Sequence, residues 1–312
     1  VEGIISGVGA ILIFLPQILI LMFFLNILED TGYMSRVAFM MDRFMNKIGL
    51  HGKSVLPLMS GYACAIPGIM ASRTIDNWKE RLMTILILPL MSCSARLPVY
   101  ALMIGAFIPQ KQIWGIFNLQ GITMVGMYFL GTATAIIIAA LLSRFIRERG
   151  RSSFVMELPP YRIPLARSVA RQLYLRGKLF VLDAGKIIMA ISIILWFLAS
   201  FPQTDINGKP NSIHQSYAGR IGHAIEPLIE PLGFDWKIGV GLITSFAARE
   251  VVVSTLATLY NVEGGEDNII GITKALKDDI NPDGSSRYTP LVALSIMVFY
   301  VYAAQCMATF AI

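Results

Sequence analysis

The stretch GYACAIPGIMASRT, residues 61–74, decides how this chain must fold. All but its last two residues lie in an uncharged segment, residues 54–72, that approaches the length of a membrane span. Gly61, Pro67 and Gly68 should break a helix there. At membrane depth, irregular backbone survives only where protein or water surrounds it. We therefore expect a re-entrant hairpin rather than a straight spanning helix.

The composition predicts an all-α, polytopic membrane protein. Hydrophobic residues make up 55% of the 312 residues and charged residues only 15%, whereas soluble proteins carry about 25% charged residues. Residues 3–28, 112–143 and 288–312 contain no charge at all. Each of these runs is long enough to cross a bilayer as a helix.

Charges and helix breaks divide the chain into six regions. We expect a first span at 1–28, a gate region at 29–110 made of an interfacial helix, a re-entrant hairpin and a broken span, a span at 111–143, a basic cytoplasmic loop at 144–178, a span at 179–201, and a second gate region at 202–312 made of an outer loop, a re-entrant hairpin, an outer loop and a span. The chain begins without Met and ends in an apolar run, so we expect it to be part of a longer protein.

The basic loop sets the predicted topology. Residues 144–178 hold nine Lys or Arg and two Glu, and loops rich in Lys and Arg stay on the cytoplasmic side. The net charge of +6 therefore indicates topology and contact with anionic lipid rather than nucleic acid. Counting spans from this loop, the hairpin at 54–75 enters from inside and a second one at 238–260 enters from outside. The two blocks thus form an inverted repeat with discontinuous helices, a pattern typical of transport sites at the membrane midplane.

Three cysteines lie at the breaks or polar points of these blocks: Cys64, Cys93 between Ser92 and Ser94, and Cys306. A helix break frees carbonyl oxygens, and a thiol adds a soft ligand that favours borderline metals over Mg²⁺ or Ca²⁺. Each cysteine taken alone is better explained as a small buried hydrophobic residue. Their coincidence with the breaks favours a role in a metal pathway.

Charged residues inside apolar segments are the other candidates. Arg249 and Glu250 are either a structural pair or a hairpin tip that lines the pathway. Arg73 and Arg96 could bind backbone carbonyls at helix ends, and Pro98 should add a break in the span at 82–110.

Four motifs closely resemble the ferrous-iron transport protein B (FeoB) family of bacteria, and the resemblance covers nearly the whole chain. They are LEDTGYMSRVAFMMDRFMNKIGLHGKSVLPLMSGYACAIPGIMASRT at 28–74, LPLMSCSARLPVYALMIGAF at 88–107, SFAAREVVVSTLATLY at 245–260 and FYVYAAQCMATFA at 299–311. The resemblance implies the membrane domain of a transporter in the bacterial inner membrane, with Cys64, Cys93 and Cys306 along an iron path. It also implies gate regions similar to those of nucleoside transporters.

The same resemblance implies the cofactors and partners. GTP and Mg²⁺ would act only through an N-terminal G domain that this sequence lacks, so we expect no enzyme activity in this chain. Membrane lipid, that G domain, a small FeoA-type protein and a second copy of the chain are the candidate partners. The family's first gate often reads GFGCNVP, and here it reads GYACAIP. A role for the family's Asn side chain therefore does not carry over to Ala65.

The predicted function is Fe²⁺ uptake under GTP control. A carrier of another solute, such as a nucleoside or another divalent metal, on the same scaffold is the alternative. A membrane thiol enzyme or redox sensor is a third hypothesis, but such an enzyme needs a base beside its cysteine, and no His is near any of the three in sequence.

Overall fold

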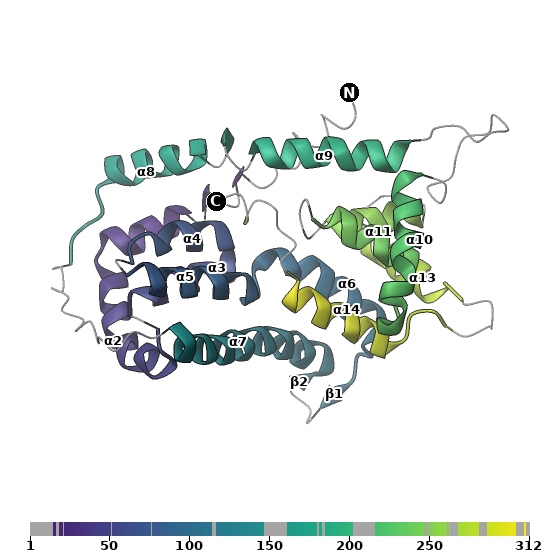
Figure 1. Cartoon of the computed structure of the whole chain (residues 1–312), viewed down its shortest axis with the longest axis horizontal. Helices are drawn as coiled ribbons and strands as arrows, with labels where there is room; N and C mark the ends of the chain where they lie inside the picture. Colours follow the sequence, from purple (N-terminus) through teal and green to yellow (C-terminus); the bar gives the residue numbers. More distant parts are fainter. Residues whose placement is uncertain are drawn as a thin grey trace. The chain divides into compact units, whose positions relative to one another are not determined.

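Figure 1 shows a structure made almost entirely of helices, as the composition predicts. This computed structural model describes residues 15–16, 19–20, 22–50, 52–75, 77–113, 117–146, 161–179, 181–182, 185–201, 216–246, 249, 251–260, 262, 268–280, 286–303 and 309. Cys306 and Glu250, both predicted site residues, lie outside the described residues.

The chain forms two compact units, each with a hydrophobic core of its own. Unit 1 comprises residues 1–7, 95–128 and 188–307, and unit 2 comprises residues 8–94, 129–187 and 308–312. The first hairpin belongs to unit 2 and the second belongs to unit 1.

Unit 2 begins, among its named elements, with the amphipathic helix α2 (Tyr33–Ile48). Ala38 and Ile48 are buried, whereas Met40 and Phe44 are exposed, so the predicted helix is confirmed and its position at a membrane interface stays a prediction. The helix ends at Gly49, whose φ of +88° is left-handed. A Cβ at Gly49 would also lie 2.2 Å from Cβ of Ser143, so this turn requires glycine.

Short helices follow in unit 2: η1 (Gly52–Ser54), α3 (Val55–Ala63), α4 (Ala65–Ser72), α5 (Trp78–Ile87) and η2 (Leu88–Leu90), with α8 (Ala166–Leu179) later in the chain. Its core joins the end of α2, α5, the segment after η2 and the second half of α7 (Leu119–Ile146), through Ile48, Leu50, Met83, Ile87, Met91, Ala135 and Ala139. This packing holds the first hairpin beside two long apolar segments.

The predicted broken span lies at 78–107, and the break is real. After η2 the backbone leaves helical geometry at Met91 (ψ 132°), and it resumes in η3 (Ser94–Arg96) and α6 (Leu97–Phe107). Residues 78–107 and 119–145 are both long and apolar enough to cross a membrane. Pro98 lies in the first turn of α6 rather than at the break, because proline is tolerated where the N–H has no helical partner.

The span predicted from residue 111 starts later than expected. Helix α7 begins at Leu119, and the preceding residues form a small ribbon in which β1 (Gln112–Ile113) pairs antiparallel with β2 (Phe117–Asn118). The Asn118 side chain accepts a hydrogen bond from N of Gln120 at 3.2 Å, which favours a helix start there.

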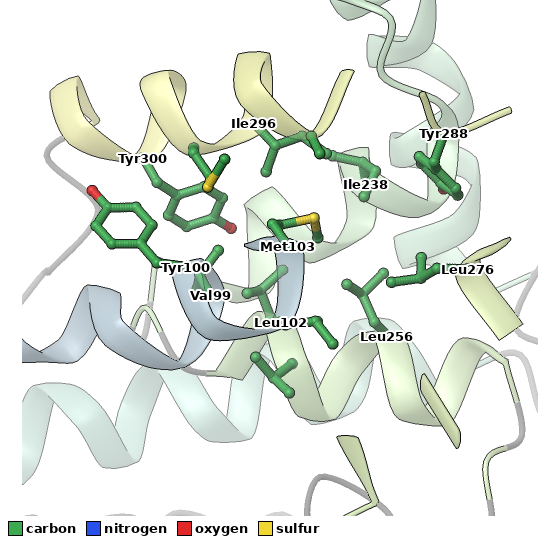
Figure 2. Packing of buried hydrophobic residues seen from close by; sticks show 14 of the residues in the cluster. Val99, Tyr100, Leu102, Met103, Ile238, Leu256, Leu276, Tyr288, Ile296 and Tyr300 are labelled. Atoms are coloured by element: carbon green, nitrogen blue, oxygen red, sulfur yellow. The ribbon is translucent and has the colours of Figure 1, made fainter. Parts of the chain in front are cut away.

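Unit 1 contains α6, α10 (Tyr217–Ile229), η6 (Glu230–Leu232), α11 (Trp236–Thr244), α12 (Val251–Leu259), α13 (Ile269–Lys277) and α14 (Pro290–Tyr302). Helix α6 contacts α12, α13 and α14. Figure 2 shows this core, with Tyr100 and Tyr300 at one end, Met103 between, and Tyr288 at the other end.

The predicted outer loops of the second gate region contain helices. Ser216 caps α10 by accepting a hydrogen bond from N of Gly219 at 3.1 Å, and Asn268 caps α13 in the same way through N of Gly271 at 2.9 Å. The prediction of loops rested on polar composition, but both segments are amphipathic with buried positions such as Ile272 and Leu276. The span predicted at 179–201 corresponds to α9 (Gly185–Ser200).

A charged network closes the end of unit 1. Asp279 accepts hydrogen bonds from Nζ of Lys237 at 2.6 Å and from the hydroxyl of Tyr260 at 2.5 Å. Arg287 lies 3.4 Å from Asp235, which caps α11, and 3.7 Å from Asp279. Burial opposes ionisation of Asp279, but its hydrogen bonds from Lys237 and Tyr260 outweigh burial and hold its pKa below the usual value.

Candidate functional site

The first hairpin breaks at Cys64. Its φ of −156° and ψ of 138° are extended, so α3 ends before it and α4 begins after it. The N–H of Cys64 still donates to the carbonyl of Ser60 at 2.9 Å, which closes the last turn of α3. The helices have nine and eight residues, or about 12 to 14 Å each, which is too short to cross a bilayer core of about 30 Å.

Glycines bring the two arms of this hairpin together. A Cβ at Gly68 would lie 2.8 Å from the carbonyl oxygen of Pro57, 2.9 Å from Leu88 and 3.4 Å from N of Gly61. The structure thus differs from the prediction in detail, since Gly61, Pro67 and Gly68 lie inside helices rather than at the break. Pro67 fits there because the first turn of α4 needs no N–H donor.

The tip of the first hairpin meets the break in the span that follows it. The hydroxyl of Ser94 donates to the carbonyl oxygen of Ala63 at 2.8 Å. Because Ala63 precedes Cys64 and Ser94 follows Cys93, this bond joins the neighbours of both cysteines. Both cysteines are partly exposed, and neither forms a disulfide. The adjacent Ser92 is fully buried, and its hydroxyl has no hydrogen-bond partner among the described residues.

The second hairpin repeats this geometry in unit 1. Helices α11 and α12 have nine residues each. The hydroxyls of Thr244 and Thr255 lie 2.8 Å apart across the pair. A Cβ at Gly241 would lie 2.7 Å from Cγ2 of Val252, so here too a glycine allows close packing.

Arg249, in the turn of the second hairpin, binds the end of the span that follows. Its Nη1 donates to the carbonyl oxygen of Tyr300 at 3.3 Å, and its Nη2 donates to that of Ala303 at 2.8 Å. Helix α14 ends at Tyr302, and Ala303 is extended with φ −67° and ψ 125°. In the first block, therefore, the tip of the hairpin contacts a break in the following apolar segment, and in the second it contacts the C-terminal end of α14.

The other predicted charges have different environments. Arg96 is fully buried in η3, and Arg73 is exposed at the C-terminal end of α4. Among the described residues, no group of three or more His, Cys, Asp or Glu side chains is arranged to hold a metal ion. Because Cys306 lies outside those residues, the convergence of the three thiols stays a prediction.

Sequence reasoning missed the two contacts that organise the blocks. The sequence spacing of Ala63 and Ser94 does not predict that they are in contact, and the spacing of Arg249 and Tyr300 does not predict their contact either. It also missed the 2.8 Å contact between the hydroxyls of Tyr62 and Thr132, which ties the first hairpin to α7. The available signal was weak. Ser94, Arg249, Tyr62 and Thr132 are polar residues in otherwise apolar segments, where a polar side chain needs a partner.

Two helical hairpins, each with its tip against the end of a helix in the apolar segment that follows, define a polytopic membrane protein with two gate regions. The profile of the Gate family, described as nucleoside recognition, matches residues 11–107 and 181–312. A second profile, described as ferrous iron transport protein B C terminus, matches residues 124–176. The chain belongs to the ferrous iron transport protein B family, FeoB, and carries its membrane portion.

Curated relatives agree with this assignment. The chain is 48% identical over its whole length to the Fe(2+) transporter FeoB of Leptospira interrogans, covering 46% of that protein. It is 39% identical to FeoB of Staphylococcus aureus, with 99% of the chain and 43% of the relative covered. A fusion of Fe(2+) transport protein A with FeoB in Porphyromonas gingivalis is 40% identical, with 99% and 40% covered.

The chain thus spans less than half the length of these three relatives. No solved structure matches it significantly.

Proposed function

We propose that this chain forms the route by which Fe²⁺ crosses the bacterial inner membrane in a GTP-regulated transporter. The hydrogen bond from Ser94 to Ala63 carries the proposal, since it joins the hairpin tip beside Cys64 to the span break beside Cys93. Thiol, hydroxyl and carbonyl groups together suit a borderline divalent metal. Conduction requires sites weak enough for the ion to leave, so we expect no closed four-ligand cage.

The proposed lining set contains the three thiols and three further oxygen-bearing side chains: Cys64, Cys93, Cys306, Ser92, Ser94 and Glu250. Ser92 supports this set because a buried hydroxyl without a partner is costly unless a ligand or water completes it.

We infer that the two gate blocks are an inverted repeat and that the basic loop is cytoplasmic. Tyr174 on α8 is exposed, so Tyr174→Cys in a protein without its other thiols tests the topology. A membrane-impermeant maleimide should label it in inverted vesicles and leave it unlabelled in right-side-out vesicles. Labelling from the outside alone would reverse the proposed orientation.

The proposed regulation and partners come from the family. GTP and Mg²⁺ would act through a G domain outside this chain. The fusion in Porphyromonas gingivalis joins protein A to FeoB in one polypeptide, which supports association with a small protein of the FeoA type. Membrane lipid surrounds the chain, and a second copy of the chain is a further candidate partner.

The decisive experiment is Fe²⁺ flux into proteoliposomes that contain the full-length protein. Replacing Cys64 and Cys93 by Ser together should lower the flux by about tenfold or more, since each lost metal–sulfur contact weakens binding. Met59→Leu is the matched control because it removes an exposed sulfur from the same hairpin. Native flux in a correctly folded double variant would show that the thiols only fill space.

A second candidate is a carrier of another solute, which the printed description of the Gate profile, nucleoside recognition, supports. Radiolabelled uridine, Mn²⁺ and Fe²⁺ should be compared in the same proteoliposomes. We expect Fe²⁺ to accumulate and uridine to stay at the level of empty liposomes.

A further inference from the structure

The carbonyl groups at the end of α14 are held by a positive charge. The last turn of a helix leaves carbonyl oxygens without intrahelical partners. Here the oxygens of Tyr300 and Ala303 accept hydrogen bonds from the two Nη atoms of Arg249, at 3.3 and 2.8 Å. Both oxygens therefore face one guanidinium group, where the chain leaves helical geometry.

This guanidinium is buried and incompletely satisfied. Arg249 is 4% exposed. In the part of the chain that the structure describes, no carboxylate pairs with Arg249 and its Nε has no hydrogen-bond partner. A buried cation is costly without such partners. Two carbonyl dipoles and the negative end of the α14 dipole offset that cost, so the end of α14 is an environment that favours a cation.

The two sides of the contact differ in rigidity. Tyr300 is 1% exposed within the core of unit 1 (Figure 2), which fixes its backbone. Arg249 instead reaches the carbonyls through a long side chain from the turn between α11 and α12. The oxygen of Tyr300 is therefore anchored, and N–H of Ala303 donates to the carbonyl of Phe299 at 2.8 Å, whereas the guanidinium can leave both oxygens by changing rotamer.

We propose that the carbonyl oxygens of Tyr300 and Ala303 form a divalent-cation site, and that Arg249 occupies it as a tethered cation when metal is absent. Carbonyls at helix breaks coordinate cations in transporters. A guanidinium and a metal ion repel each other at such short range, so metal entry displaces Arg249, which closes the site again once the metal leaves. This inference rests on the proposed Fe²⁺ route and adds a gate to it.

Flux without GTP tests the gate in the full-length protein. Arg249→Met keeps the length and removes the cation, so GTP-independent Fe²⁺ leak should rise by about tenfold or more, since two charge-assisted hydrogen bonds are lost and each is worth about a factor of ten. Arg249→Lys keeps a positive charge that reaches fewer oxygens, so its Fe²⁺ leak should lie between that of the native protein and that of Arg249→Met. Arg220→Met is the matched control, because Arg220 is exposed on α10 of the same unit.

Binding of Mn²⁺, measured by electron paramagnetic resonance on the purified full-length protein, tests the site without transport. Arg249→Met should bind Mn²⁺ more tightly than the native protein, because no guanidinium competes for the carbonyls, so an additional ion should appear at Mn²⁺ concentrations that leave the native site empty. Unchanged leak and unchanged Mn²⁺ stoichiometry in a native-like variant overturn the proposal. Should the Met variant aggregate, Arg249→Lys with native leak and native Mn²⁺ binding does the same. Absence of Fe²⁺ flux in the native protein would instead contradict the proposed function, and Mn²⁺ binding would still decide the site.

Discussion

The two hairpins reach the same geometry by different chemistry. In the first, a neutral hydroxyl of Ser94 binds the carbonyl of Ala63 at the tip, 2.8 Å away. In the second, a buried guanidinium of Arg249 at the tip binds two carbonyls of the following helix. The direction is also reversed, because the tip accepts in the first block and donates in the second.

This difference shows what the blocks share. Both use helices of eight or nine residues and a glycine at the crossing, and both bring a tip to a point where a helix of the following apolar segment ends. The side chain that fills the contact is variable, so the arrangement depends on backbone shape. The neutral hydroxyl of Ser94 is not repelled by a cation and can keep its hydrogen bond when one is near. The charged guanidinium of Arg249 is repelled by a cation and can be displaced by it.

The largest expected effect on stability comes from the glycine where the two arms of the first hairpin cross. Gly68→Ala puts a Cβ 2.8 Å from the backbone oxygen of Pro57, and backbone cannot move aside easily, so the free energy of unfolding should fall by about 2 to 3 kcal/mol. Unfolding in mixed detergent measures this. Gly105→Ala is the control, since nothing lies within 4 Å of its added Cβ. Equal stability of the two variants would show that the arms do not pack as described.

The next effect concerns the charged network around Asp279 in unit 1. Asp279→Asn should lower the free energy of unfolding by about 2 kcal/mol at pH 7, the usual range for hydrogen bonds to a charged group. The exposed neighbour Asp278→Asn is the matched control.

The pH dependence of this network follows from the lowered pKa of Asp279. A lowered pKa in the folded state adds stability above the unfolded value of about 3.9, and this stability is lost as pH falls through the folded pKa. The difference in free energy of unfolding between the native protein and Asp279→Asn should therefore become smaller below about pH 4. A gap that stays constant down to pH 2 would contradict this account.

A smaller effect is expected at the second crossing. Gly241→Ala meets only the end of the Val252 side chain, at 2.7 Å. A single methyl group is displaced more easily than backbone, although Val252 is buried and stiff, so the loss should be about 1 kcal/mol or slightly more, near the lower limit for overpacking. Adding Val252→Ala removes the clash, and the double variant should show no additional cost from Gly241→Ala. Additive losses would place the strain elsewhere.

The smallest effect should come from Ser94→Ala, which removes the contact at the first tip. The loss in unfolding free energy should be about 0.5 to 1 kcal/mol for one exposed neutral hydrogen bond, with a measurable fall in Fe²⁺ flux. Thr258→Ala is the control, because its exposed hydroxyl donates to the carbonyl of Ser254 within α12. An effect on flux as large as that of the Cys64, Cys93 double variant would make Ser94 a principal ligand.

The sequence by itself determined the membrane class, the two short hairpins and the broken span at residues 92–98. These follow from local physics, because uncharged runs longer than a bilayer must be buried and short apolar arms cannot cross it. It did not determine where the hairpin breaks. Glycine and proline are read as helix breakers, yet Gly61, Pro67 and Gly68 are accommodated inside α3 and α4.

Only the tertiary structure decided which polar groups meet. The partner of Ser94 lies 31 residues away and the partners of Arg249 lie 51 and 54 residues away. Such pairing depends on how helices pack, since a freed carbonyl accepts from any donor that packing brings near it. The same holds for helices α10 and α13. Their polar composition indicated loops, but their few apolar residues are buried in the folded protein and stabilise the helices.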